Sequence, residues 1–174
     1  LRSDAKLTQD SRQLLPGDLF VAIRGTVQDG AAYISVALEK EAAVVLVSSQ
    51  CDPKHYQELD LANIQLFVIE ELETRLPKIA KSFYLGLSGH LPVIGVTGTN
   101  GKTSITHMLA QMFRSEDNSE VAVVGTMGVG SIEALKPSNN TTPGVTDVYR
   151  LFKDFANDGQ RNFACTVMEV SSHA

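Results

Sequence analysis

Apolar residues follow two periodicities along the chain, one typical of strands and one typical of helices. Short runs with few polar residues are typical of strands that are covered on both faces. We expect such strands at residues 19–23, 43–47, 66–69, 93–97, 121–124 and 163–170. Apolar residues three and four positions apart predict helices at residues 31–41, 71–85 and 102–113, and a further helix through Val148, Leu151, Phe152 and Phe155. Residues 125–145 are rich in Gly, Ser, Asn, Thr and Pro, and we expect a loop there.

The order of these elements predicts an α/β fold with parallel strands. Two strands joined by a helix of this length almost always form a right-handed crossover. Ligands then collect at the carboxyl ends of the strands. Because the chain ends soon after the run at 163–170, we expect a truncated sheet whose last strand is an exposed edge.

The clearest helical pattern lies at residues 102–113, and a break precedes it. Ile105, Met108, Leu109 and Met112 fall at i, i+3, i+4 and i+7. Gly86, Gly89 and Pro92 end the preceding helical pattern. We therefore expect two domains, a small N-terminal α/β domain at residues 1–90 and the first part of a second parallel-sheet domain at residues 91–174.

The composition is that of a core-forming globular protein and limits the classes of partner. The 174 residues are 43% apolar and 20% charged. A net charge of −5 argues against nucleic acid, whose phosphates require a basic surface. No apolar run approaches the ~20 residues of a membrane span, and we see no secretory leader. Cys51 and Cys165 lack the spacing of a metal site and fit reduced side chains in the cytoplasm.

The run Gly98-Thr99-Asn100-Gly101-Lys102-Thr103-Ser104 carries the strongest chemical signal. It lies between an expected strand and an expected helix, as a phosphate-binding loop requires. Glycines let backbone amides approach phosphates, and the helix N-terminus favours negative charge. Lys102 can contact the β- and γ-phosphates of ATP, and the Thr103 hydroxyl can ligate Mg²⁺. The second domain is therefore expected to be the first part of a P-loop-type ATPase domain.

This loop departs from the standard pattern at one position. Val96 stands where a glycine is expected, five residues before Gly101. The alternative interpretation is an ordinary glycine-rich turn between a strand and a helix. That alternative does not explain why glycine, lysine and threonine occur next to one another where a strand leads into a helix.

A second acidic residue usually completes the Mg²⁺ site of such domains from the end of a neighbouring strand. Glu169 is placed for this role, because it ends the apolar run 163–168. The alternative is that Glu169 marks the exit of the strand to solvent. Ser171, Ser172 and His173 follow, without the Gly-x-Ser-x-Gly elbow of a hydrolase. We expect ligands for substrate or metal among them, and His173 stays open as a ligand, a hydrogen-bond partner or a bystander.

Residues 95–104 resemble the ATP loop of the Mur ligases and of their folate and cyanophycin relatives. Asn140-Thr141-Thr142-Pro143 looks like the substrate loop of the Mur ligases that form the muramoyl tripeptide, and residues 168–174 are similar to the metal-bearing strand end of that group. In the first domain, the group's UDP-binding domain is matched by Asp10-Ser11-Arg12, residues 16–22, Gly25 and Asp29-Gly30. The resemblance covers essentially the whole chain.

The resemblance implies an ATP-dependent ligase of peptidoglycan synthesis in the bacterial cytoplasm. In such a ligase ATP phosphorylates the D-glutamyl γ-carboxylate of UDP-MurNAc-L-Ala-D-Glu, and the amine of a diamino acid attacks the acyl phosphate. The choice between meso-diaminopimelate and L-lysine stays open. A carboxylate is a poor electrophile until its oxygen becomes a leaving group. The protein therefore mainly positions anions and neutralises their charge.

The resemblance also implies roles for single residues. Lys102, Thr103 and Glu169 would be the catalytic residues, with Lys102 on the phosphates and with Thr103 and Glu169 on Mg²⁺. The whole run 98–104 would bind ATP. The muramoyl-peptide end of the substrate would contact Asn140, Thr141, Thr142 and Ser171, and the UDP end would face Gln9, Ser11, Thr26, Val27 and Gln28. A local turn hydroxyl is the alternative for Ser11, and the other four UDP residues match by position more than by identity.

The family's central domain continues past this chain to a carbamylated lysine, and a third domain follows. We therefore expect this chain to be inactive in ligation by itself, and we expect a monomer. The alternatives are a folylpolyglutamate or cyanophycin type of ligase, a non-catalytic nucleotide-binding module, and a plain P-loop hydrolase. Binding of UDP would distinguish the tripeptide-forming ligase from a folate or cyanophycin type, and nucleotide binding without UDP-substrate binding would favour the non-catalytic module. The hydrolase lacks an evident water-positioning residue in this sequence.

Overall fold

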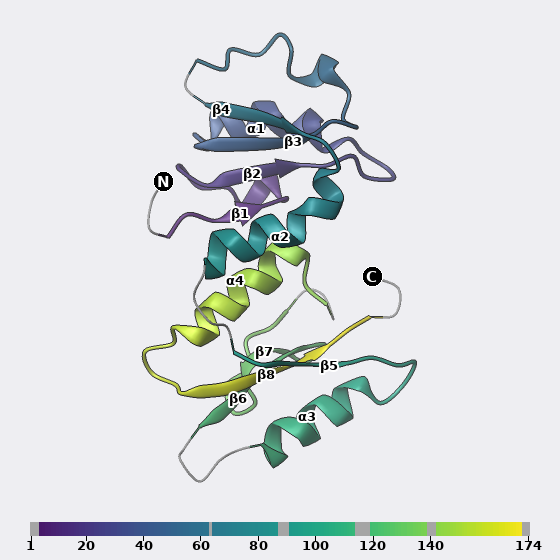
Figure 1. The fold of residues 1–174 in the computed structure, drawn as a ribbon, viewed down its shortest axis with the longest axis vertical. Helices are drawn as coiled ribbons and strands as arrows, with labels where there is room; N and C mark the ends of the chain where they lie inside the picture. Colours follow the sequence, from purple (N-terminus) through teal and green to yellow (C-terminus); the bar gives the residue numbers. More distant parts are fainter. Residues whose placement is uncertain (1–3, 63, 87–90, 114–118, 139–141, 172–174) are drawn as a thin grey trace. The chain divides into compact units, whose positions relative to one another are not determined.

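The computed structural model describes residues 4–62, 64–86, 91–113, 119–138 and 142–171 (Figure 1). Contacts divide the chain into two compact units, Leu1–Phe83 and Tyr84–Ala174. Each unit holds one four-stranded sheet with helices, so the expected α/β class is confirmed. The expected domain division at residue 90 remains a prediction. Within the described ranges, no helix combines the length and apolar character needed to span a membrane.

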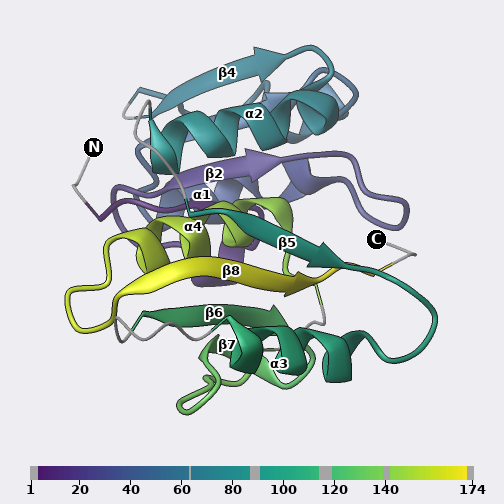
Figure 2. The same ribbon diagram turned by 60° about the horizontal axis from the view of Figure 1, so that its bottom comes forward.

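The first unit is built on a parallel sheet of order β1-β2-β3-β4. Its strands are β1 (Leu7–Thr8), β2 (Leu19–Ala22), β3 (Val44–Ser48) and β4 (Gln65–Ile69). Its helices are α1 (Ile34–Glu39) and α2 (Leu72–Leu85), and its 3-10 turns are η1 (Ser11–Gln13), η2 (Gly30–Tyr33) and η3 (Pro53–His55). Figure 2 shows α2 in front of this sheet and α1 behind it. Ile34 and Ala37 of α1 pack in one core cluster with alternate residues of β2 and β3, as the period of two predicts.

The second unit is built on a sheet of order β5-β8-β6-β7. Its strands are β5 (Val93–Val96), β6 (Glu120–Gly125), β7 (Gly128–Ser131) and β8 (Phe163–Glu169), and its helices are α3 (Lys102–Met112) and α4 (Val145–Ala156). β5, β8 and β6 are parallel. Figures 1 and 2 show α3 and α4 on opposite faces of this sheet. The carboxyl ends of β5 and β8 therefore lie at one edge, between the two helical layers.

Two expectations about the second sheet are wrong. β7 lies within residues 125–145, where we expected only a loop, and it runs antiparallel to β6. Gly128 and Gly130 of β7 have φ of 135° and 119°, so these glycines allow a close hairpin rather than an open loop. β8, which we expected to be an exposed edge, lies between β5 and β6 and pairs with both.

The helix expected at 102–113 forms as α3, but of its apolar stripe only Leu109 packs against the core cluster of the sheet. Ile105, Met108 and Met112 are 48%, 59% and 75% exposed, whereas Thr106 and Ala110 are buried. Thr106 and Ala110 follow Thr103 by three and seven positions and so share its face of the helix. Small side chains on that face let α3 approach the sheet closely, and this orientation directs Thr103 toward β8.

Candidate functional site

The phosphate loop and Glu169 lie side by side because β5 and β8 are adjacent parallel strands. Val96, the last residue of β5, pairs with Glu169, the last residue of β8. The loop 98–101 leaves β5 at that point and leads into α3. Val96 is buried in the core cluster beneath α3, which explains a valine at this position. The sheet therefore brings together the loop and the carboxylate that the sequence singled out.

The loop has the backbone conformation that its glycines allow. Gly98 and Gly101 have φ of 144° and 78°, which other residues rarely adopt. Gly101 is also the N-cap of α3 and provides no side chain to cap the helix. The first amides of α3 are consequently not bonded to a capping side chain, which suits an anion. The Lys102 ammonium is half-buried at the loop and donates to the Gly98 carbonyl oxygen at 2.7 Å.

Glu169 does not mark an exit to solvent, since it is only 1% exposed. Its Oε2 accepts a hydrogen bond from the Thr103 hydroxyl at 3.0 Å. Thr126 supplies two further hydrogen bonds, from its backbone N–H to Oε1 at 3.0 Å and from its hydroxyl to Oε2 at 3.1 Å. A buried carboxylate needs such partners, because desolvation without them is costly.

Thr126 and its neighbour Gly125 are site residues that the sequence analysis missed. Gly125 ends β6, which pairs with β8, and Thr126 follows it. A Cβ added to Gly125 would lie 2.2 Å from Glu169 Oε1, so a side chain at this position would displace the carboxylate. The available signal was the Gly-Thr pair just after the apolar run 121–124, because polar residues at the carboxyl end of a central strand commonly serve a site.

The Thr103 hydroxyl and the Glu169 carboxylate fit a Mg²⁺ site. Mg²⁺ prefers oxygen ligands and is usually held by one or two carboxylates, with phosphates and water completing its shell. No group of three or more His, Cys, Asp or Glu side chains within the described ranges could hold a metal ion. A site of one hydroxyl and one carboxylate would form no such group. These two residues therefore suit a metal that arrives with a nucleotide.

The expected muramoyl-peptide residues are partly described. The Thr142 hydroxyl donates to the backbone oxygen of Glu169 at 3.1 Å and accepts from the backbone N–H of Ser171 at 2.9 Å. Thr142 thus ties its loop to the carboxyl end of β8 and lies next to Ser171. Asn140, Thr141 and His173 lie outside the described residues.

A separate pocket of about 270 Å³ lies in the first unit and contains three of the expected UDP residues. Its lining residues are Arg24, Gly25, Thr26, Val27, Gln28, Asp29, Asp52, Lys54 and His55. The two lining segments follow β2 and β3, so the pocket lies at the carboxyl edge of the parallel sheet. The Gln28 side chain accepts a hydrogen bond from the Tyr33 hydroxyl, and Val27 is 91% exposed.

Asp29 joins the two walls of this pocket. Its Oδ1 accepts from the backbone N–H of Ala31 at 2.9 Å, and its Oδ2 accepts from the backbone N–H of Asp52 at 2.8 Å. Burial raises the pKa of Asp29, but the hydrogen bonds from Asp52 and Ala31 outweigh it, so the pKa is lowered overall. Burial also raises the pKa of the neighbouring Cys51 thiol to about 12, with a further contribution from Asp29. Cys51 is therefore an unreactive core residue.

Gln9 and Ser11 are not among the pocket's lining residues, but they follow β1 at the same edge of the sheet. The turn that begins at Ser11 is capped by Asp10, which accepts from the backbone N–H of Arg12 at 3.0 Å. A side-chain hydrogen bond from Arg12 lowers the pKa of Asp10 to about 2. The side chain that caps this turn is thus that of Asp10, and the role of Ser11 stays a prediction.

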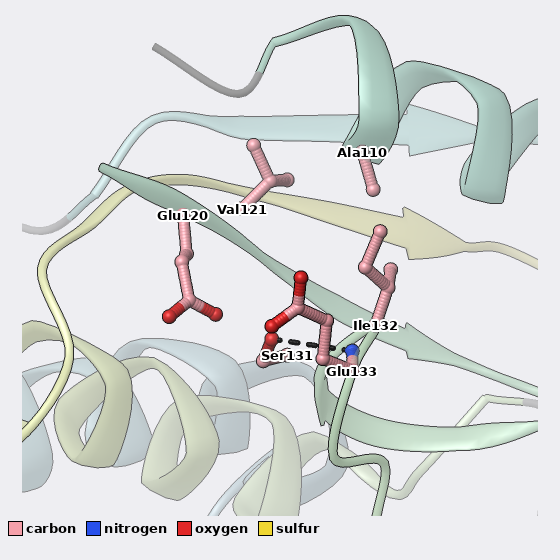
Figure 3. A pocket seen from close by; sticks show the side chains of 6 residues that line it. All are labelled: Ala110, Glu120, Val121, Ser131, Ile132 and Glu133. Atoms are coloured by element: carbon pink, nitrogen blue, oxygen red, sulfur yellow. Dashed lines mark hydrogen bonds between the residues drawn. The ribbon is translucent and has the colours of Figure 1, made fainter. Parts of the chain in front are cut away.

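Two further hollows in the second unit contain none of the expected site residues. The first lies beneath α3 at the start of β6, and Figure 3 shows Ala110, Val121 and Ser131 among its lining side chains. At about 10 Å³ it holds no more than a water molecule. The second, of about 310 Å³, lies at the amino end of β8, next to Phe163. Both are at the opposite edge of the sheet from the phosphate loop.

Comparison with known proteins connects both units to one family. Residues 6–84 match the model of the catalytic domain of the Mur ligase family, and residues 96–174 match that of the Mur ligase middle domain. UDP-N-acetylmuramoyl-L-alanyl-D-glutamate–2,6-diaminopimelate ligases from Coxiella burnetii and Vibrio vulnificus are 38% and 39% identical, over 97% and 96% of this chain. Each match covers 33% of the relative, so the chain spans about a third of the length of these proteins.

Solved structures agree with this relationship. A UDP-N-acetylmuramoyl-L-alanyl-D-glutamate–2,6-diaminopimelate ligase is similar with a TM-score of 0.71 and 25% identity, over 99% of this chain and 34% of that one. The MurF ligase from Thermotoga maritima, solved in complex with ADP, is similar in fold with a TM-score of 0.62 and 21% identity, over 100% of this chain and 34% of that one. With two adjoining family domains matched and a phosphate loop beside a buried carboxylate, the chain belongs to the Mur ligase family.

Proposed function

We propose that this chain is part of an ATP-dependent ligase that adds diaminopimelate to the D-glutamyl γ-carboxylate of UDP-MurNAc-L-Ala-D-Glu. The proposal rests mainly on the hydrogen bond of 3.0 Å from the Thr103 hydroxyl to Oε2 of the buried Glu169 carboxylate, next to the phosphate loop. The names of the relatives that are 38% and 39% identical support the reaction and favour diaminopimelate over L-lysine.

In this proposal the second unit holds the nucleotide. The backbone amides of residues 98–104 and the Lys102 ammonium bind phosphate oxygens and neutralise their charge. Thr103 and Glu169 hold Mg²⁺, which supplies further positive charge near the transferred phosphoryl group. A ligase of similar fold, MurF from Thermotoga maritima, was solved in complex with ADP, which is consistent with an adenine nucleotide as a ligand of this fold.

The first unit would hold the UDP end of the substrate. The carboxyl edge of its sheet carries Gln9, Ser11 and the 26–28 segment, and the pocket of about 270 Å³ is large enough for part of a nucleotide. Thr142 and Ser171, at the carboxyl end of β8, would contact the muramoyl-peptide end of the substrate. The reacting carboxylate would then lie in the second unit, where the nucleotide is held.

The test is a ligation assay on the full-length protein with UDP-MurNAc-L-Ala-D-Glu and ATP. ADP release should require diaminopimelate, and Lys102→Ala should lower kcat by about two orders of magnitude. Release of ADP without an added amino acid would favour a P-loop hydrolase instead. Dependence on L-lysine alone would contradict the assigned amino acid, and a requirement for folate or cyanophycin would contradict the substrate class.

A further inference from the structure

The Glu169 carboxylate is held on both of its oxygens by residues of neighbouring elements. Oε1 accepts from the Thr126 backbone N–H at 3.0 Å, and Oε2 accepts from the Thr126 and Thr103 hydroxyls at 3.1 and 3.0 Å. Thr126 therefore contacts both oxygens at once, while Thr103 contacts only one. This two-point contact determines the plane in which the carboxylate lies.

The space around the carboxylate is equally restricted. A Cβ on Gly125 would lie 2.2 Å from Oε1, 2.7 Å from Cδ and 2.9 Å from Cγ of Glu169. The side chain of Glu169 thus lies directly against the backbone of Gly125. The absence of a side chain at Gly125 leaves space for the Glu169 carboxylate, and Thr126 forms hydrogen bonds to it in that position.

A fixed carboxylate matters for any cation that binds to it. Partners in the outer shell orient a metal ligand, and their loss typically lowers metal affinity ten- to a hundredfold. A carboxylate that rotates freely must be ordered when the metal binds, and this ordering has an entropic cost. Thr126 reduces that cost by holding Glu169 beside Thr103 before any metal arrives.

We infer that Thr126 is a positioning residue which, together with Gly125, fixes the Glu169 carboxylate beside the Thr103 hydroxyl and thereby raises the affinity for Mg²⁺-bound nucleotide. The second half of this inference rests on the proposed function, because it takes Glu169 to be a Mg²⁺ ligand. The first half, the fixed carboxylate, stands on the hydrogen bonds alone.

The experiment compares Thr126→Val and Thr126→Ser in the 174-residue chain, with Thr74→Val as the matched control. Thr74 is exposed on α2, so its substitution tests the loss of a hydroxyl far along the chain from the site. The first readout is the side-chain NMR signal of Glu169 without nucleotide. Two distinct γ-proton shifts indicate one rotamer, and merged shifts indicate averaging. The second readout is the gain in ADP affinity when Mg²⁺ replaces EDTA, measured by calorimetry.

Thr126→Val should merge the Glu169 signals and lower the Mg²⁺-dependent gain by about tenfold or more, whereas Thr126→Ser stays within about threefold of the wild type. ADP affinity in EDTA should not change in either variant or in the Thr74→Val control. Should Thr126→Val fail to fold, Gly125→Ala provides a second variant that displaces the same carboxylate and should give the same loss.

Three results distinguish a failure of the inference about Thr126 from a failure of the proposed Mg²⁺ site. Unchanged Glu169 signals in a folded Thr126→Val chain would overturn the inference, and so would changed signals with an unchanged Mg²⁺-dependent gain. A wild-type chain that binds ADP without any gain from Mg²⁺ would instead refute the proposed metal site. In that case the NMR signals alone would still decide whether Thr126 fixes Glu169.

Discussion

The hydroxyls of Thr126 and Thr166, both in the second unit, differ in whether they have a hydrogen-bond partner. The Thr126 hydroxyl donates to a buried carboxylate, whereas the hydroxyl of Thr166 in β8 is buried and has no hydrogen-bond partner within the described residues. A buried polar group without a partner loses its hydration and gains nothing in return. The effect of a buried threonine hydroxyl on stability therefore depends on whether a neighbouring group can bind it.

Thr166→Val should stabilise the protein. Valine has nearly the same shape, so the change removes an unsatisfied hydroxyl without opening a cavity, and we expect a gain of about 1 kcal/mol in the free energy of unfolding. Urea unfolding followed by circular dichroism measures it. A loss of stability would mean that the hydroxyl has a partner in the folded protein.

Asp29→Asn should lower the stability of the first unit near neutral pH. The loss of stability relative to the wild type should be smaller at acidic pH. An amide presents only one acceptor, so one of the two backbone N–H groups that Asp29 binds is left unsatisfied, at a cost of about 1–3 kcal/mol. The folded protein lowers the pKa of Asp29 below its ordinary value of 3.8, so its stabilisation is present above that pH. The wild type loses this advantage as the pH falls through the lowered pKa, and the difference between the two proteins should narrow.

The measurement is the urea midpoint of both proteins at pH 7 and at successively lower pH. Asp10→Asn offers a comparison, because the pKa of Asp10 is lowered to about 2 mainly by the side chain of Arg12. A difference between wild type and Asp29→Asn that stays constant with pH would show that Asp29 does not act through its charge.

At the residue scale, the sequence identified the residues expected to bind phosphate and metal, but not the residue that fixes the position of the carboxylate. Lys102 and Thr103 could be found because glycine, lysine and threonine together at a strand–helix junction are typical of a phosphate loop. Glu169 could be found because an acid seldom ends a buried apolar run without a partner. For Thr126 the sequence offered only its place after the run 121–124, because its contact with Glu169 depends on a register between β6 and β8 that only the fold provides.

At the scale of elements, α3 shows that an apolar stripe can predict a helix and still mislead about its buried face. Thr103, Thr106 and Ala110 lie toward the sheet, and Met108 and Met112 lie outward. The position of the phosphate loop sets the rotation of this helix, since Thr103 has to reach Glu169. Hydrophobic periodicity carries no information about that constraint.

Met112→Gln should therefore leave stability nearly unchanged, within about 0.5 kcal/mol, because this side chain is 75% exposed. Ala110→Met should cost about 1–3 kcal/mol, because a large side chain does not fit between α3 and the sheet. Thermal unfolding of both variants checks this. The reverse order of effects would mean that the apolar stripe is the buried face after all.

The strands were easier to predict than their order. Continuous apolar runs identified β2 to β6 and β8, as expected where strands covered on both faces exclude polar residues. β4 and β5 have such runs although Phe67, Val68 and Val93 are 50%, 53% and 41% exposed. The glycine-rich β7 lacked that signal, since Gly128 and Gly130 serve its conformation rather than its burial. The central position of β8 followed from pairing between distant segments, which no local pattern encodes.

At the scale of the whole molecule, the chain carries two matched family domains but only about a third of the length of its relatives. Phosphoryl transfer needs the nucleotide, the metal and both substrates to be positioned together. We therefore expect the 174-residue chain to release no ADP coupled to tripeptide formation, while the full-length protein does. Tripeptide product from the isolated chain would contradict this expectation.

The UDP-linked muramoyl peptide is the ligand that we propose for this chain, and calorimetric titration with UDP-MurNAc-L-Ala-D-Glu measures its binding. UDP alone serves as the control ligand, and Ser11→Ala as the variant. We expect saturable binding of both ligands by the wild type and weaker binding of both by Ser11→Ala. A folded chain that binds neither ligand, or a Ser11→Ala variant that binds them as tightly as the wild type, would contradict the assignment of the UDP site.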